Sequence, residues 1–173
     1  MAGMRPLHAS TGRQKRRAHL GEDDVRVGRV FAMREMSANE ARAFLADGVR
    51  TAKLATTRAD GAPDVVPVWF VLDGDEVVFT CSSSSVKARN LARDPRAALV
   101  VDDEAFPHAF VRVRGTVEMA VRPDDFRSWT TRIAARYVGA GRAEEYGRRN
   151  EEFDDCLVRL MPDSILARAD VAL

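Results

Sequence analysis

Two turn dipeptides separate three β-forming segments in the first half of the chain. Asp60-Gly61 and Asp73-Gly74 are hairpin signals, because glycine tolerates the positive φ that tight turns need. The segments around them are Thr51–Thr57, Asp64–Leu72 and Glu76–Cys81, which are rich in β-branched and aromatic residues. Strands joined by such short turns must run antiparallel. The sequence therefore predicts an antiparallel sheet rather than alternating strands and helices.

Later segments extend this sheet. We expect strands at Ala97–Val101, Phe110–Ala120 and Cys156–Met161. Gly115 is predicted to mark a bulge, and Ile165–Ala169 forms either a further short strand or a loop. Six or so antiparallel strands in about 120 residues close most simply into a small barrel. The expected fold class is therefore mainly β, a β-barrel with flanking helices.

Two short helices are expected among the strands. Ser37-Ala-Asn-Glu40 has the pattern of a capping box, in which a serine hydroxyl and a glutamate carboxylate satisfy exposed amides, so a helix is predicted over residues 38–46. The second helix is expected to begin near Val86 and to end at Asp94-Pro95, since the residue before a proline disfavours helical backbone.

A longer helical region begins at Pro123. Apolar residues recur there at spacings of three and four, as on one face of a helix. Gly139 and Gly141 are expected to break it before a second helical piece over Ala143–Asn150. Arg132, Arg136 and Tyr137 lie in the first piece, where they either form a solvated face or contact a ligand.

The first 35 residues differ in composition from the rest. They hold eight Lys or Arg and four Asp or Glu, a net charge of +4, whereas the whole 173-residue chain carries +1. Low hydrophobicity with high charge is typical of disordered segments. We therefore expect a disordered N-terminal extension over residues 1–35, or a start codon assigned too early, and one folded domain over residues 36–173. An arginine-rich arm that binds nucleic acid is the alternative.

Charge and cysteine content argue against several classes of protein. The small net charge suggests neither a nucleic-acid partner nor a membrane partner, and no apolar run approaches the roughly 20 residues that cross a bilayer. Cys81 and Cys156 show neither metal-ligand spacing nor a CxxC motif, so we expect reduced thiols, a cytoplasmic protein and no metal site. The carboxylates of residues 102–104 are expected in a solvated turn.

The most informative local feature is the serine run before the second helix. Ser82–Ser85 precede the helix start at Val86, and Lys87 follows it directly. A helix N-terminus presents unpaired amides and a partial positive charge, to which the hydroxyls and the ammonium group add donors. This combination can bind a phosphate or another anion. Serines before a helix also serve as plain caps, so the local chemistry leaves both interpretations open.

Four segments, taken in order, resemble a known superfamily. They are Thr51–Gly61, Pro63-Asp-Val-Val-Pro-Val-Trp-Phe70, Phe79-Thr80 and Val86-Lys-Ala-Arg-Asn-Leu-Ala-Arg-Asp-Pro95. This order is similar to that of the pyridoxamine 5'-phosphate oxidase-like split-barrel superfamily. Within it, the chain resembles the flavin/deazaflavin oxidoreductases of the B type, which use coenzyme F420. The resemblance runs from residue 37 to residue 168, and its most specific part is the Lys-x-Arg-Asn-Leu-x-x-Asp-Pro stretch.

The resemblance implies a homodimeric split β-barrel of the FMN-binding type, with two cofactor sites between the subunits. The cofactor ring would lie along Val65, Val66, Pro67 and Val68, with Phe79 and Thr80 contributing from the next strand. The cofactor phosphate would meet Ser82, Ser83, Ser84, Ser85, Val86 and Lys87. Related proteins often carry an arginine two places before the lysine, where this chain has Ser85.

The number of cations distinguishes two cofactors. The phosphate of FMN carries close to two negative charges, whereas the phosphodiester of F420 carries one. Lys87 with helix amides and hydroxyls suits the single charge, so we expect coenzyme F420, with FMN as the alternative. The resemblance implies hydride transfer to a small-molecule substrate. The cofactor itself carries that chemistry, so no side chain is assigned as a catalytic acid or base.

Some alternatives remain open. The first alternative is an FMN-dependent oxidase or reductase of the same fold. The second is a non-catalytic protein that binds flavin, deazaflavin or haem. His108 is the weak candidate for a haem ligand. Pro67 marks either a bulge or a strand edge without a ladder partner. Trp69 is expected to pack in the core or at the dimer interface rather than to stack on the cofactor ring, because tryptophan buries a large area. Lys53 is expected on the polar face of its strand.

Overall fold

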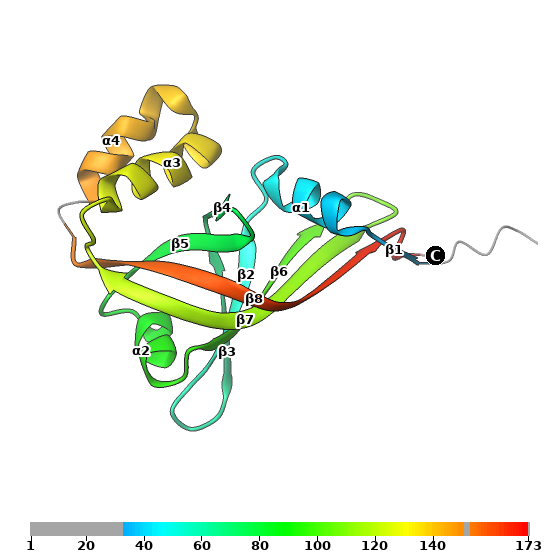
Figure 1. Cartoon of the computed structure of the whole chain (residues 1–173), viewed down its shortest axis with the longest axis horizontal. Coiled ribbons are helices and arrows are strands. Elements are labelled where there is room, and N and C mark those ends of the chain that lie inside the picture. The colour runs from blue at the N-terminus through cyan, green and yellow to red at the C-terminus, as the bar shows by residue number, and fades with distance from the viewer. Residues whose placement is uncertain (1–32, 151–152, 173) are drawn as a thin grey trace, which may run out of the picture. The chain divides into compact units, whose positions relative to one another are not determined.

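The barrel is built around two long antiparallel strands. The computed structural model describes residues 33–150 and 153–172, in which β7 (Ala109–Val121) pairs with β8 (Asp155–Ala169) along its whole length (Figure 1). β6 (Arg96–Asp103) pairs with β7, and β5 (Glu76–Ser82) pairs with the first part of β8. Every pairing is antiparallel, so the sheet predicted from the turn dipeptides is confirmed.

The two ends of the sheet are consecutive in the chain. The strand order is β3-β2-β6-β7-β8-β5-β4, where β2 spans Ala52–Thr57, β3 spans Pro63–Val68 and β4 spans Phe70–Asp73. The sequence predicted a single strand here. The structure divides it at Trp69, because the chain leaves β2 and continues beside β5 at the other end of the sheet. The barrel is therefore closed by a covalent connection between β3 and β4.

One face of every strand from β2 to β8 contributes to a single core. Its largest fully buried side chains are Phe70, Phe79, Leu54, Leu99 and Leu160. Burying one such side chain contributes about 1.5–3 kcal/mol, so these residues dominate the stability of the barrel. Two helices, α1 (Ala38–Ala46) and α2 (Val86–Arg93), pack their apolar faces against the same core. The expected barrel with flanking helices is confirmed.

Both short helices begin at the serine that the sequence indicated. The Ser37 Oγ atom accepts a hydrogen bond from the Glu40 amide at 3.3 Å, and a Glu40 carboxylate oxygen accepts one from the Ser37 amide at 2.7 Å. This capping box starts α1, and the helix predicted over residues 38–46 is confirmed. At α2 the cap is Ser85, and the helix ends at Asp94, immediately before the proline.

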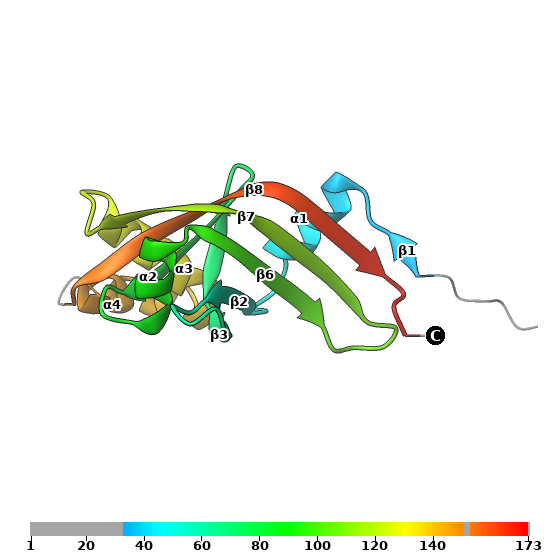
Figure 2. The ribbon, with the colours of Figure 1, turned by 90° about the horizontal axis from the view of Figure 1, so that it is seen from below.

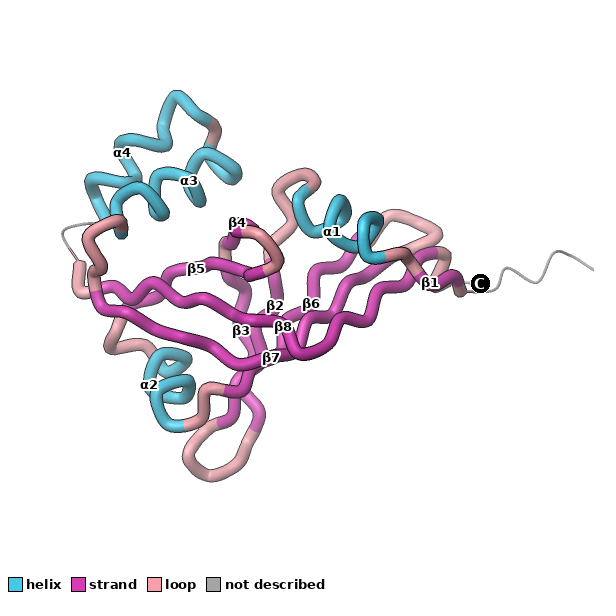
Figure 3. The backbone as a smooth tube through the Cα atoms, viewed as in Figure 1, coloured by secondary structure: helices cyan, strands magenta, loops and turns pink. Residues whose placement is uncertain are grey.

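A helical hairpin covers the outer face of one side of the barrel. α3 (Phe126–Val138) places Phe126, Trp129 and Ile133 against Val71 and Leu157 of the sheet, forming a second apolar cluster. Figures 1 and 3 show α3 and α4 (Ala140–Asn150) together at one end of the long strands, away from α1. The expected break between the helical pieces is confirmed at Gly139, which has φ 84°.

Two glycines differ in their effect on the backbone. Gly141 was expected to break the helical region, but it lies in the first turn of α4, where a side chain would meet nothing within 4 Å. Gly115 lies at the predicted bulge, where the register of β7 against β8 shifts. A Cβ atom there would come 1.9 Å from the Met161 carbonyl oxygen, so the close approach of the two strands requires glycine.

The final strand is longer than predicted. β8 continues through Pro162, so Ile165–Ala169 belongs to the same strand as Cys156–Met161. Pro162 pairs with Gly115 at the register shift, where a missing amide donor removes little from the ladder. Figure 2 shows β7 and β8 curving together across the barrel.

A short strand precedes the domain that the sequence outlined. β1 (Arg34–Glu35) pairs with the end of β8, so these two residues, expected in the N-terminal extension, belong to the sheet. Residues 1–32 of that expected extension lie outside the described residues. Among the described helices, none is both long and apolar enough to cross a membrane.

Candidate functional site

A cavity of about 400 Å³ lies between the connection from β3 to β4 and the α3–α4 hairpin. Its volume is within the range of small-molecule sites, which run from roughly 300 to 1,000 Å³. Strands and helices contribute different sides of it. The lining residues are Pro67, Val68 and Trp69 from the connection, Thr80 from β5, Lys87 from α2, Thr130, Ile133 and Ala134 from α3, Tyr146, Arg149 and Asn150 from α4, and Asp155 from β8.

Four residues predicted from the sequence line this cavity together. Pro67 and Val68 reach it from the end of β3, Thr80 from β5 and Lys87 from the first turn of α2. The chain brings them together because β3 runs directly into β4, which pairs with β5, and β5 runs into α2. Topology therefore assembles at one place the segments that the resemblance associated with a cofactor.

Three other predicted residues point elsewhere. Val65 lies on the outer face of β3 with 60% of its surface exposed, and Val66 packs against the barrel core. Phe79 is fully buried in that core, so its side chain does not face the cavity. Side chains alternate along a strand, and Thr80 therefore faces the cavity because its neighbour Phe79 faces inwards.

The serine run stabilises the start of α2. The Ser85 hydroxyl accepts a hydrogen bond from the Ala88 amide at 3.2 Å and donates one to the Ser82 carbonyl at 2.7 Å. The Ser83 amide donates to the Asp154 carbonyl at 2.9 Å, which ties this loop to the start of β8. The described residues that line the cavity do not include Ser82, Ser83, Ser84, Ser85 or Val86. Of the predicted phosphate-binding segment from Ser82 to Lys87, only Lys87 lines the cavity.

Two opposite charges share the cavity. Lys87 is half-buried and makes no hydrogen bond or ion pair with any residue that the structure describes. Asp155 is also half-buried. Burial raises the pKa of the Asp155 carboxyl, and the positive charge of Lys87 opposes that increase. The cavity thus contains the Lys87 ammonium group, which can pair with a ligand, and the Asp155 carboxyl, whose pKa is raised.

Trp69 forms part of the cavity wall. Its indole stacks on the ring of Tyr137, with the ring centroids 4.8 Å apart and the planes 3° from parallel. The Phe70 amide donates to the Tyr137 hydroxyl at 3.2 Å, and that hydroxyl donates to the Arg50 carbonyl at 3.0 Å. The sequence placed Trp69 in the core or at a dimer interface. It is 39% exposed and absent from the barrel core, because α3 supplies it with a stacking partner.

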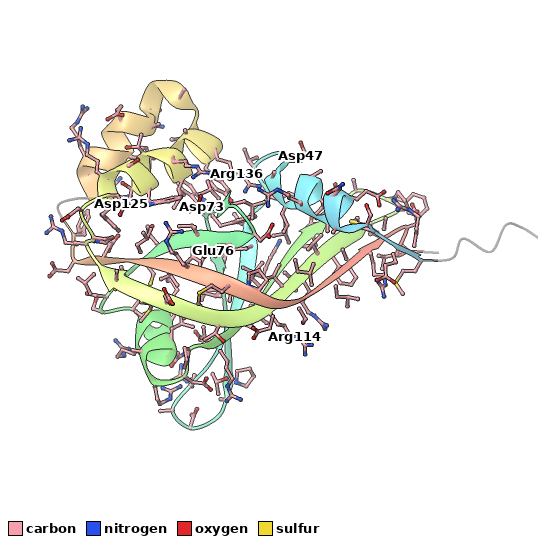
Figure 4. All side chains as sticks on the ribbon, viewed as in Figure 1. Asp47, Asp73, Glu76, Arg114, Asp125 and Arg136 are labelled. Carbon is pink, nitrogen blue, oxygen red and sulfur yellow. The ribbon has the colours of Figure 1, made fainter. Side chains whose placement is uncertain are left out.

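Two arginines of α3, Arg132 and Arg136, bind backbone carbonyls of this chain. Arg136 donates to the carbonyl oxygens of Leu45 at 2.7 Å and Phe70 at 3.1 Å, pointing from α3 toward α1 (Figure 4). Burial lowers the pKa of its guanidinium. Arg132 donates to the Leu72 carbonyl at 2.6 Å. Arg132 is exposed, as expected for a solvated face, whereas the half-buried Arg136 makes structural contacts that neither expected interpretation included.

No motif in the sequence indicated that α4 contributes to the cavity. Its exposed charges are typical of a solvated helix, and yet Tyr146, Arg149 and Asn150 face the cavity. The Tyr146 ring lies 6.2 Å from that of Trp69. Asp155 was also missed, because it stands at the beginning of a strand with no motif around it. Their role depends on how the α3–α4 hairpin packs, which is a non-local property.

The remaining candidates lie away from the cavity. Asp102 and Asp103 end β6 rather than forming a turn, and they pair with Lys53 at 2.5 Å and Arg50 at 3.2 Å. His108 lies in the loop between β6 and β7 and does not line the cavity. In the described parts of the chain, no group of three or more His, Cys, Asp or Glu side chains could hold a metal ion.

An antiparallel barrel whose sheet ends meet beside a ligand-sized cavity defines the split-barrel class. Residues 37–167 match the pyridoxamine 5'-phosphate oxidase family, and the chain belongs to that family. Among solved structures, the conserved hypothetical protein Rv2991 from Mycobacterium tuberculosis is 25% identical, with a TM-score of 0.69 over 78% of this chain and 86% of that protein.

Two further structures carry names that refer to a ligand. An F420 reductase is 28% identical, with a TM-score of 0.56 over 70% of this chain and 92% of its own. An FAD-binding protein from Mesorhizobium loti is 17% identical, with a TM-score of 0.59 over 79% of this chain and 96% of its own. The latter likeness concerns the fold alone.

Proposed function

We propose that this protein is an F420-dependent oxidoreductase that holds the deazaflavin ring in the cavity, with the phosphodiester beside Lys87. The observation that carries the proposal is the half-buried Lys87, which has no partner in the described chain and faces the same cavity as Trp69 and Thr80. The similarity to an F420 reductase at 28% identity supports the same cofactor.

The lining fits a planar ring that carries an anionic group. Pro67, Val68, Ile133 and Ala134 provide apolar surface, and the rings of Trp69 and Tyr146 offer faces or edges for stacking. The Thr80 hydroxyl and the Asn150 amide can form hydrogen bonds with ring heteroatoms. Lys87 and Arg149 can form charge-assisted hydrogen bonds with the anion. The cavity therefore combines apolar surface with convergent polar and charged groups, which together can orient a bound cofactor.

The chain's own contribution is position and exclusion of water. When bound, reduced F420 would supply a hydride to a small organic acceptor. Trp69 is fixed by its stacking on Tyr137, so it presents a rigid wall against which a ring can be oriented. α4 closes the opposite side through Tyr146. We assign no side chain as a general acid or base, and a solvent proton completes the reduction of the acceptor.

FMN is the second candidate, because the structure adds a cation that the sequence did not indicate. Arg149 lies in the same cavity as Lys87, and two cations can hold a phosphate monoester. Asp155 offsets one of these charges. The three side chains together carry a net charge of +1 when all are ionised, which matches a singly charged diester better than a doubly charged monoester.

The functional unit in this proposal is a homodimer. Val65 is 60% exposed on the edge strand β3, two residues from the cavity-lining Pro67. A second copy packed there would bury this apolar side chain and cover the mouth of the site. Light scattering after size exclusion checks this arrangement, which requires about twice the 19.1 kDa mass of the chain.

A cofactor panel tests the function. Purified protein is titrated with F420, FMN, FAD and haem, and binding is followed by absorbance and fluorescence. Reduced F420 is then supplied with a panel of quinone-like and unsaturated acceptors. We expect F420 to bind most tightly and to be oxidised only when an acceptor is present. Tight binding without turnover would indicate a carrier, and a Soret band without affinity for F420 would indicate a haem protein.

A further inference from the structure

We propose that Asp155 sets the charge selectivity of the cavity, disfavouring doubly charged phosphate monoesters relative to singly charged phosphodiesters. This assignment rests on the proposed function, since it assumes that the anionic group of the cofactor lies beside Lys87. Asp155 acts on the ligand by position and charge, and it is not assigned a step in the reaction.

The fold holds Asp155 in place. It is the first residue of β8 and pairs with Ser82 of β5, the residue at which the serine run begins. The Arg122 amide donates to the Asp155 carbonyl at 3.2 Å, and the Ser83 amide donates to the neighbouring Asp154 carbonyl at 2.9 Å. These contacts hold its backbone in place on both sides, so the side chain starts from a fixed position at the cavity.

The Asp155 carboxylate lines the cavity, so its negative charge acts on any ligand that binds there. In the described part of the chain it forms no ion pair with Lys87 and no side-chain hydrogen bond, although both side chains line the cavity and are half-buried. The described charged or titratable groups around it are Lys87 from α2, Arg149 from α4, and its chain neighbours Asp154 and Cys156, with Cys81 opposite on β5. Within residues 33–150 and 153–172, no cation therefore forms an ion pair with this carboxylate.

Coulomb's law makes the consequence quantitative. At a fixed distance and dielectric, the repulsion between Asp155 and a ligand group is proportional to the charge of that group. The free energy of repulsion is therefore twice as large for a dianion as for a monoanion and zero for a neutral ligand. Removing the carboxylate charge should change the affinity for a dianion by the square of the factor found for a monoanion.

Three probes and two variants test this relation. Asp155→Asn removes the charge and keeps the shape, and Asp154→Asn removes a charge from the adjacent residue, which is exposed and does not line the cavity. At pH 8, we expect Asp155→Asn to strengthen binding of FMN about tenfold and of F420 about threefold, and to leave riboflavin unchanged. We expect Asp154→Asn to change each affinity less than about twofold, because exposed charges are screened.

A second arm uses the pH dependence of the unmodified protein. Burial raises the pKa of Asp155, so this carboxyl takes up its proton at a higher pH than an ordinary aspartate. Protonated Asp155 should behave like the asparagine variant. The difference in F420 affinity between the two proteins should therefore shrink as the pH falls. F420 is the probe for this arm because its phosphodiester keeps a single charge, whereas the FMN phosphate takes up a proton of its own at about pH 6.

The outcomes separate this assignment from the proposed function. Equal changes for FMN, F420 and riboflavin would show an altered cavity shape and would overturn the assignment alone, as would a difference in F420 affinity that stays constant with pH. If none of the three probes binds the unmodified protein or either variant, the cavity is not a cofactor site, and both proposals are overturned. Matching melting temperatures establish that the variants are folded.

Discussion

The ring of Tyr137 lies parallel to that of Trp69, and its hydroxyl accepts a hydrogen bond from the Phe70 amide at the start of β4 and donates one to the Arg50 carbonyl before β2. One residue of α3 thus orients the indole that lines the cavity and anchors the strand that follows it. The ring provides the stacking on Trp69, and the hydroxyl provides the backbone contacts.

Replacing Tyr137 with phenylalanine isolates the contribution of the hydroxyl. The stacking on Trp69 is retained, but the Phe70 amide and the Arg50 carbonyl lose their partner. We expect the free energy of unfolding to fall by about 1–3 kcal/mol, measured by urea denaturation. Tyr146→Phe is the control, because that hydroxyl has only a 3.5 Å contact with Arg142. Equal losses in the two variants would contradict the anchoring role.

Lys87→Ala should weaken the binding of F420. A charge-assisted hydrogen bond in a half-buried site contributes about 1–3 kcal/mol, and this loss should appear directly in calorimetric titration. Arg93→Ala removes the same charge from the far end of α2, outside the cavity lining, and should leave affinity nearly unchanged. Unchanged affinity in Lys87→Ala would place the phosphate elsewhere.

Two glycine substitutions should move stability in opposite directions. Gly115→Ala forces a Cβ atom into the Met161 carbonyl, so the strands must separate, and we expect a loss of about 1–3 kcal/mol or more. Gly141→Ala meets nothing within 4 Å and replaces a flexible residue in a helix, which should stabilise by roughly 0.5–1 kcal/mol. Thermal denaturation of both variants measures the contrast. A neutral Gly115→Ala would mean that the bulge adapts freely.

The Cys81 thiol should be unreactive in the folded protein. Burial raises the pKa of Cys81 to about 11, so the thiol keeps its proton at pH 8 and cannot act as a nucleophile. Iodoacetamide should label Cys81 rapidly only after unfolding, which mass spectrometry can follow. Because the folded pKa lies above the unfolded value of about 8.5, this group's contribution to stability is complete below that pH and declines as the pH rises toward 11. Rapid labelling of the native protein would contradict the buried placement.

Local signals predicted the boundaries of the short helices. Ser37 and Glu40 contact each other across three residues, and Ser85 caps α2 over the same distance, so the sequence contains both partners of each contact within one turn. The hairpin at Gly74 is equally local. Features of this kind require no knowledge of the rest of the fold.

Non-local pairing explains the failures. Residues 64–72 form a continuous β-prone run, and only the availability of β2 on one side and β5 on the other divides it at Trp69. The strand predicted over Cys156–Met161 continues through Pro162, because the partner of this proline is Gly115, which lies far earlier in the chain at the register shift. In both cases the deciding residue is distant in sequence.

The cavity could be predicted only in part for the same reason. Pro67, Val68, Thr80 and Lys87 belong to segments that carry the family resemblance, and they line the cavity. Tyr146 and Arg149 lie on a helix whose composition suggests only solvation, so their position depends on the packing of α4 against α3. Phe79 shows the converse, since its segment lies at the cavity but strand alternation directs its side chain into the core.

At the covalent junction formed by Trp69, the residues that pair the strands are largely different from those that line the cavity. No backbone ladder spans β3 and β4, and much of the surface around that junction comes from the α3–α4 hairpin, which packs outside the barrel. Substitutions on that hairpin can therefore reshape the cavity without disturbing strand pairing. Such an architecture is readily diversified, because a lineage can acquire a new ligand while every hydrogen bond of its sheet stays in place.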